Sequence, residues 1–166
     1  MKNTRTSVGK DAKHGLGPDS WWTVDVDVYL ENENNPPDFT VETCLPTTGN
    51  DIAFHNRGRN GFKVAFHLHD LTGNGYCFPG PPQGEDKALA STIGEGCPPK
   101  NSTEQWEEFK AIKVKDSRMT LVVRNLNQSV TKFGYTLRVT KDDGATFLEL
   151  DPGGDNQNGN FAADWF

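Results

Sequence analysis

Residues 51–70 read DIAFHNRGRNGFKVAFHLHD, and this stretch decides the fold class. Two runs of alternating residues flank a Gly-containing connection, which is the pattern of a β-hairpin. Side chains alternate along a strand, so the second run has two distinct faces. One face carries the apolar residues Phe62, Val64, Phe66 and Leu68. The other carries Lys63, Ala65, His67 and His69. If Phe54 pairs with Val64 across this hairpin, Asp51 lies opposite His67.

The same alternation recurs along the chain. Thr23 to Leu30 places valines inward and two aspartates, Asp25 and Asp27, on a wet face, as in a sheet solvated on one side. Further strands are expected over residues 38–43, 109–115, 119–123, 133–139 and 146–150. In the 109–115 strand, Ile112 and Val114 are expected on one face. About eight short strands without βαβ units predict an all-β fold, an antiparallel two-sheet β-sandwich or small barrel, of which we take the sandwich.

Residues 71–105 break this rhythm. The segment is rich in Gly and Pro, and only 85–91 has the character of one or two helical turns. Long loops in compact domains are uncommon and tend to be functional or disordered. We therefore predict one long loop with a short helix, whose entrance is packed by Tyr76 and Phe78, and we take these two aromatic residues as candidate ligand-binding residues.

Length and composition bound the organisation of the chain. Its 166 residues fit one domain, divided into a flexible arm (1–20), the sandwich (21–150) and a Gly/Asn-rich aromatic tail (151–166). The net charge of −6 makes a nucleic-acid partner unlikely, because phosphate binding needs a basic surface. No apolar run approaches the roughly 20 residues of a membrane span, so no membrane association is expected. The N-terminus lacks the apolar run of a secretory signal, which predicts a cytoplasmic location.

The three cysteines are too few and too irregularly spaced for a disulfide framework or a zinc site. Cys77 and Cys97 lie at the two bases of the 71–105 segment. We therefore expect them to approach each other, while Cys44 stays free. An oxidised pair would close a loop of about 20 residues and contribute roughly 3 kcal/mol.

Two family resemblances concern short stretches. The C-terminal third, with Asp151-Pro152 at the exit of a strand, resembles the DP-EP family of bacterial proteins of unknown function, which implies a sandwich and no known activity. Gly61 followed by His67-Leu68-His69 resembles the opening of the first cupin motif. That resemblance implies that the two histidines bind a metal.

His67 and His69 are the main chemical candidates. Two residues apart on a strand, they share one face at about 6.5–7 Å, a spacing that suits a shared divalent metal ion. A carboxylate of Asp51 or Asp70 is the expected third ligand, in a two-His, one-carboxylate site. The alternative interpretation is two ordinary polar residues on a solvated sheet face.

Three other groups of residues are candidate binding sites. Arg57 and Arg59 at the expected hairpin tip have the chemistry to bind a carboxylate or phosphate, or serve solubility only. The aromatic residues of the tail are expected to bury against their own domain or a neighbouring subunit, and they are Phe161, Trp165 and Phe166. Oxygen ligands of the kind that Ca²⁺ prefers occur at Asp151, Asp155, Asn156, Asn158 and Asn160.

These observations lead to one function hypothesis with two alternatives. The chain shows neither a nucleophile elbow nor a phosphate loop. The leading hypothesis is a non-enzymatic binding or structural module that contacts a protein partner or a second copy through the 71–105 segment and the tail. The alternatives are a metal-dependent enzyme using His67 and His69, and a calcium-dependent, lectin-like carbohydrate binder.

Overall fold

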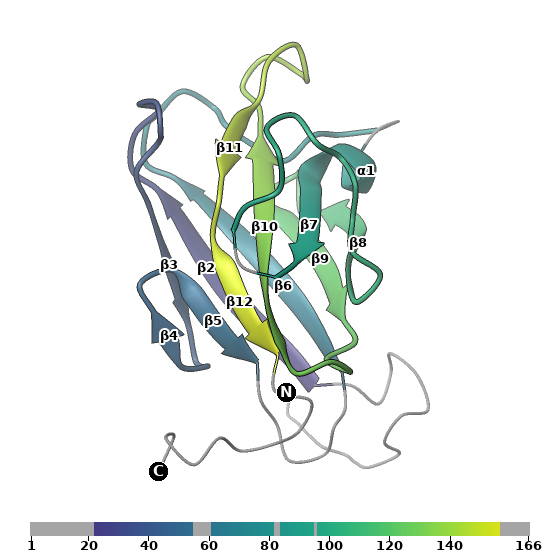
Figure 1. The fold of residues 1–166 in the computed structure, drawn as a ribbon. Helices are drawn as coiled ribbons and strands as arrows, with labels where there is room; N and C mark the ends of the chain where they lie inside the picture. Colours follow the sequence, from purple (N-terminus) through teal and green to yellow (C-terminus); the bar gives the residue numbers. More distant parts are fainter. Residues whose placement is uncertain (1–21, 55–60, 82–83, 95, 157–166) are drawn as a thin grey trace.

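The computed structural model describes residues 22–54, 61–81, 84–94 and 96–156. These residues form two β-sheets that pack face to face, so the all-β sandwich is confirmed (Figure 1). The five-stranded sheet has the order β3 (Phe39–Thr43), β2 (Trp22–Leu30), β6 (Phe62–Asp70), β9 (Thr120–Asn125) and β8 (Phe109–Lys115). The six-stranded sheet has the order β11 (Leu148–Leu150), β10 (Thr131–Val139), β12 (Gly153–Asn156), β5 (Asp51–Phe54) and β4 (Thr47–Thr48), with β7 (Leu89–Ile93) also paired to β10.

The expected 51–70 hairpin is wrong, although both of its strands exist. β5 pairs with β4 and β12 in one sheet, whereas β6 lies between β2 and β9 in the other. Ile52 and Phe54 are buried together with the intervening Ala53, as in a strand covered on both faces. A Gly-containing connection can therefore join the two sheets as well as two paired strands. Asp51 consequently does not lie opposite His67.

The sheets are mixed rather than antiparallel. β2 runs parallel to β6 and β12 runs parallel to β5, while the other strand pairs are antiparallel. Alternation along a single strand predicts which residues are buried but not the direction of the neighbouring strand. The alternation itself is confirmed on β6, where all four apolar residues predicted to face inward are buried.

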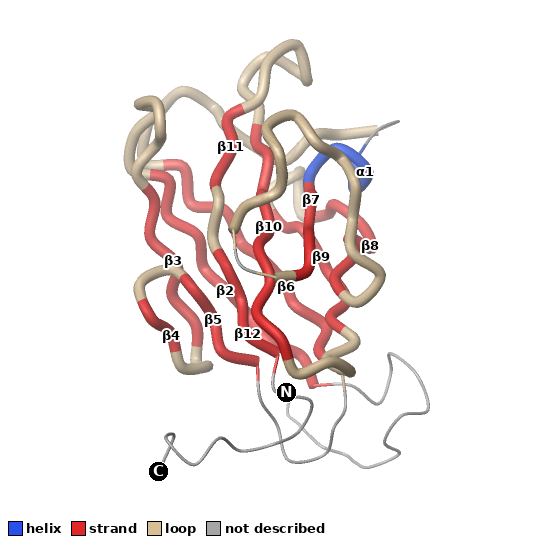
Figure 2. The backbone as a smooth tube through the Cα atoms, in the orientation of Figure 1, coloured by secondary structure: helices blue, strands red, loops and turns tan. Residues whose placement is uncertain are grey.

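The 71–105 segment contains two regular elements and is not a single long loop. It contains the five-residue helix α1 (Gly84–Ala88), the only helix among the described residues, followed directly by β7 (Figure 2). β7 pairs with β10 from Leu89 to Ile93, and residues 104–106 bond to its other side through Ser91. Tyr76 and Phe78 are buried in the core. A short strand of mostly small residues was hidden by the surrounding Gly and Pro.

The prediction that Ile112 and Val114 share one face of the β8 strand is wrong. A bulge between Ala111 and Lys113 makes Ile112 the extra residue of the strand, and its side chain is exposed. The extra residue reverses the alternation. Val114 therefore packs against the core and does not share the expected face with Ile112, while Lys113 and Lys115 lie on the outer face with their partners on β9.

The six-stranded sheet continues beyond Leu150 into the segment assigned to the tail. β11 and β12 both pair with β10 and are separated by Asp151-Pro152. Asn156 at the end of β12 is buried and exchanges two side-chain hydrogen bonds, of 2.8 and 2.9 Å, with Asn125 of β9. This amide pair joins the two sheets. The arm and residues 157–166 lie outside the described residues.

All three cysteines are free thiols, as expected for Cys44, but the expected approach of Cys77 and Cys97 is wrong. Cys77 bonds to Thr140 at one end of β10, while Cys97 packs against Gly134. Six strand residues separate Thr140 from Gly134, which corresponds to about 20 Å. The two thiols therefore flank opposite parts of β10. Within the described part of the chain, no helix is long and apolar enough to cross a membrane.

Candidate functional site

His67 and His69 each contact an aspartate side chain on the outer face of the five-stranded sheet. The Nε2 atom of His67 lies 2.9 Å from Oδ1 of Asp25, and Nε2 of His69 lies 2.9 Å from Oδ1 of Asp27. The histidine side chains are 32% and 42% exposed, and those of Asp25 and Asp27 are 72% and 41% exposed. Both pairs are thus held at the surface.

The parallel pairing of β2 with β6 explains why the contact occurs twice. Asp27 is level with His67, and Asp25 is two residues earlier on the same face. Each histidine bonds diagonally to an aspartate that lies two residues before its level partner on β2. The sequence repeats of two residues, DVD on β2 and HLH on β6, therefore make two equivalent pairs side by side.

The two imidazoles differ in their second contact. Nδ1 of His67 lies 3.2 Å from the hydroxyl of Thr120, which is buried on β9. The ring of His69 stacks on Tyr29 with centroids 4.5 Å apart. Partial desolvation, together with the carboxylates of Asp27 and Glu42, raises the pKa of the Tyr29 hydroxyl. His67 therefore has both ring nitrogens engaged, whereas His69 is held by one hydrogen bond and one stacked ring.

The metal site expected from the sequence does not form. Asp51 belongs to the other sheet, and the Asp70 carboxylate accepts hydrogen bonds from Thr72, Gly75 and Tyr76. Although burial acts to raise it, these hydrogen bonds hold the pKa of Asp70 below its ordinary value. Across the described ranges, no three His, Cys, Asp or Glu side chains are grouped so that they could hold a metal ion. The nearest carboxylates orient the histidines instead.

Charge is segregated across this outer face, with β6 in the middle. Acidic side chains lie on the β2–β3 side, at Asp25, Asp27 and Glu42. Basic side chains lie on the β8–β9 side, at Lys110, Lys113, Lys115 and Arg124. Glu107, just before β8, pairs with Lys110 and Arg124 at 3.0 Å. The face therefore has an acidic half and a basic half.

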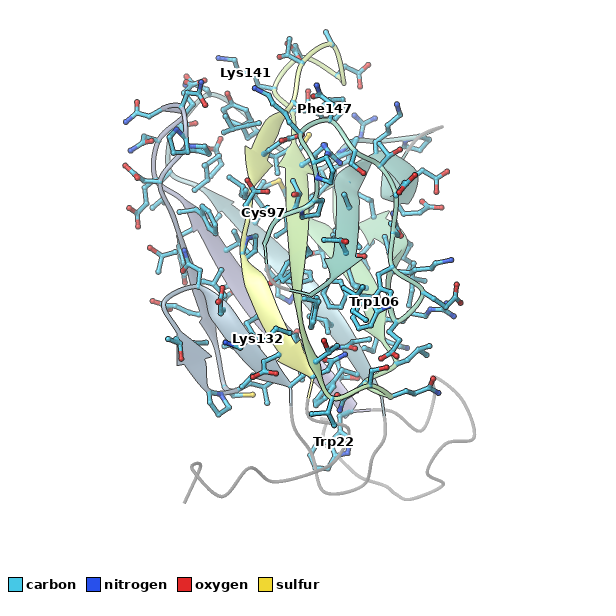
Figure 3. The ribbon with its side chains drawn as sticks, viewed as in Figure 1. Trp22, Cys97, Trp106, Lys132, Lys141 and Phe147 are labelled. Atoms are coloured by element: carbon cyan, nitrogen blue, oxygen red, sulfur yellow. The ribbon has the colours of Figure 1, made fainter. Side chains whose placement is uncertain are left out.

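The other predicted ligand-binding residues have different positions. Tyr76 and Phe78 belong to the core, so they do not line a surface site. The Tyr76 hydroxyl donates to Glu33, which also accepts a 2.8 Å bond from Lys141. In Figure 3, Lys141 lies at the upper end of the sandwich. This network joins three loops at that end.

The calcium candidates are partly used in structural bonds. Asp151 accepts a hydrogen bond from Thr136, and Asn156 is buried against Asn125. Asn158 and Asn160 lie outside the described residues. Asp151 and Asn156 therefore make structural hydrogen bonds within and between the sheets.

Arg57, Arg59 and the three tail aromatic residues also lie outside the described residues, but their points of attachment are defined. Strand pairing brings Trp22, Phe62 and Asn125 to one end of the sandwich, and Asn156 pairs there with Phe54. In Figure 3 this is the lower end of the sandwich, where Trp22 lies. Phe54 and Asn156, the last described residues before the segments 55–60 and 157–166, both lie at that end.

Sequence reasoning found the two histidines and missed their partners. Asp25 and Asp27 were correctly placed on a wet face, but β2 was not placed next to β6. The matching two-residue spacing of the DVD and HLH motifs was the available signal. No protein-family model matches this chain, and no curated protein is similar enough to serve as a relative.

Proposed function

We propose that this protein is a non-enzymatic binding module that takes a protein partner on the outer face of its five-stranded sheet. The observation that carries the proposal is that half-exposed polar side chains on an open face are held by one another in fixed positions. Two His–Asp pairs, the Tyr29 stack and the Thr120 bond restrain this surface. Restrained side chains lose less conformational entropy on binding than mobile ones.

The segregated charges support a partner that is itself charged and oriented. Electrostatic complementarity favours one docking orientation and suppresses wrong partners. The packing of the 71–105 segment favours this face over that segment as the contact surface. We also propose that the aromatic tail residues Phe161, Trp165 and Phe166 contribute to partner binding. The three free thiols support a reducing compartment such as the cytoplasm.

A comparison of baits tests the proposed face. The full chain, an Asp25→Asn/Asp27→Asn/Glu42→Gln variant and an Asp116→Asn/Asp143→Asn/Glu85→Gln control would be immobilised and exposed to the same extract of source cells. Both variants lose three negative charges. We expect a defined protein to be retained by the wild type and the control but not by the face variant. Retention of the same proteins by all three baits would contradict the proposal.

A further inference from the structure

The five-stranded sheet is symmetric in a way that suits a second copy of this chain. β6 is its central strand, with β2 and β3 on one side and β9 and β8 on the other. The two flanks carry opposite charge. Asp25, Asp27 and Glu42 contribute −3, and Lys110, Lys113, Lys115 and Arg124 contribute +4, with Glu107 beside them contributing −1.

A two-fold axis along β6 would make this face complementary to itself. Two copies packed face to face about that axis place β2 against β9 of the second copy, and β3 against its β8. Each acidic half then faces a basic half. A two-fold axis across the strands would instead place acid against acid. The charges thus select one of the two symmetric arrangements.

The register of the strands brings individual charges level with one another. Glu42 is paired through Asp27 to His67, and Lys115 is paired through Thr120 to the same His67. Rotation about β6 keeps the level along the strand. Glu42 therefore lies opposite Lys115 of the second copy.

Asp25 and Lys113 are also level with each other, but they do not lie directly opposite, because β2 faces β9 rather than β8 of the second copy. Both are level with Ala65, at the centre of β6. Lys113 and Lys115 have no ion-pair partner among the described residues, unlike Lys110 and Arg124. These two lysines are the basic groups of the β8–β9 half that are available to a second copy, and Lys63 also lies on this face, on β6 itself.

The size of the face predicts a weak association. Five strands about 4.8 Å apart and roughly 20 Å long offer on the order of 500 Å² per copy. Two copies would bury about 1,000 Å² in total, at the lower limit for a specific interface. Exposed charges dominate this contact, so salt should screen it.

We infer that this protein forms a reversible homodimer through the outer faces of its five-stranded sheets, with the two-fold axis along β6. This inference rests on the proposed function, since it names the partner of the proposed face. The facing Glu42 and Lys115 side chains define the contact, and β6 of each copy lies on the axis.

A charge-swap experiment on the full chain tests the dimer. One variant carries Lys113→Glu and Lys115→Glu, and the other carries Asp25→Lys and Glu42→Lys. Sedimentation equilibrium at low salt should show dimers for the wild type and monomers for each variant. An equimolar mixture of the two variants should restore a dimer containing one copy of each, because both pairs of facing halves are again opposite in charge. At 1 M NaCl the wild type should be monomeric.

Controls separate this inference from misfolding and from the proposed function. Lys87→Glu/Lys100→Glu makes the same charge change away from the face and should dimerise like the wild type. Thermal melting of each variant checks folding. A monomeric wild type, or a mixture that stays monomeric, would overturn the dimer. A face-dependent protein retained in the bait comparison would then leave the binding module standing, whereas a dimer without any such protein would make self-association its whole role.

Discussion

The outer faces of the two sheets differ in their exposure to solvent. The β10–β11 part of the six-stranded sheet is covered by its own chain: the segment around Gly96 and Cys97 crosses β10, and the Asn101 amide donates to Glu149 (Figure 3). Beneath it, Arg138 is only 3% exposed and bonds to Glu149 at 2.9 Å. The outer face of the five-stranded sheet keeps its His–Asp pairs at the surface.

This difference shows how exposure sets the energetic role of similar pairs. An exposed ion pair contributes about 0–1 kcal/mol because water screens it. A buried pair is costly to break, since removing one partner leaves an uncompensated charge. The covered face is therefore expected to act in stability, and the open face to act in recognition.

The largest expected effect comes from breaking the covered pair. Glu149→Ala leaves the Arg138 guanidinium buried, where its two terminal nitrogens already have no hydrogen-bond partner in the structure. We expect the free energy of unfolding to fall by about 3–5 kcal/mol. Urea unfolding followed by tryptophan fluorescence measures this.

A second variant distinguishes a buried charge from lost packing. Arg138→Met/Glu149→Leu removes both charges and keeps apolar volume, and should recover most of the loss. If the double variant is as unstable as Glu149→Ala, the charge explanation fails.

The next prediction concerns the close approach of the segment around Gly96 to β10. A Cβ at Gly134 would lie 1.8 Å from the Gly96 carbonyl oxygen, so Gly134→Ala must displace backbone. We expect a loss of about 1–3 kcal/mol, as for other overpacked sites. Gly84→Ala in α1 is the matched control, because its Cβ would be 4.0 Å from the nearest atom. Similar losses in both variants would show that the close approach is not the cause.

The open face should tolerate the loss of its pairs. We expect His67→Ala and Asp25→Ala each to lower the free energy of unfolding by no more than about 1 kcal/mol. A double-mutant cycle isolates the coupling between them. A coupling above about 2 kcal/mol would show that this pair acts in stability, and the contrast between the faces would disappear.

The sequence predicted local features better than neighbours. Alternation placed Phe66 in the core and His67 outside, since both follow from one strand's own geometry. It did not pair Asp25 with His67, because 42 residues separate them and the parallel neighbour of a strand leaves no local pattern. The β7 strand was missed because its residues show no alternation of apolar and polar side chains. They are buried because the strand lies between β10 and the 104–106 segment.

The smallest expected effect concerns an exposed carboxylate that is nonetheless tightly bonded. Asp142, between β10 and β11, accepts hydrogen bonds from the side chain and amide of Thr146, at 2.6 and 2.9 Å, and from the Thr140 hydroxyl at 2.8 Å. These bonds lower the pKa of Asp142 to about 2. A carboxyl group with a folded-state pKa below its unfolded value stabilises the fold above the unfolded pKa of about 4. That contribution is lost as pH falls toward about 2.

The advantage of the wild type over Asp142→Asn should therefore be constant at pH 5–7 and shrink between about pH 4 and pH 2. Urea unfolding at several pH values measures it. Asp143→Asn removes the same charge one residue away but keeps the bonds to Thr140 and Thr146, so it should retain the acid dependence of the wild type. An advantage that is unchanged down to pH 2 would show that these hydrogen bonds do not favour the ionised carboxylate. Exposure alone would then predict the strength of a polar contact in this protein, on either face.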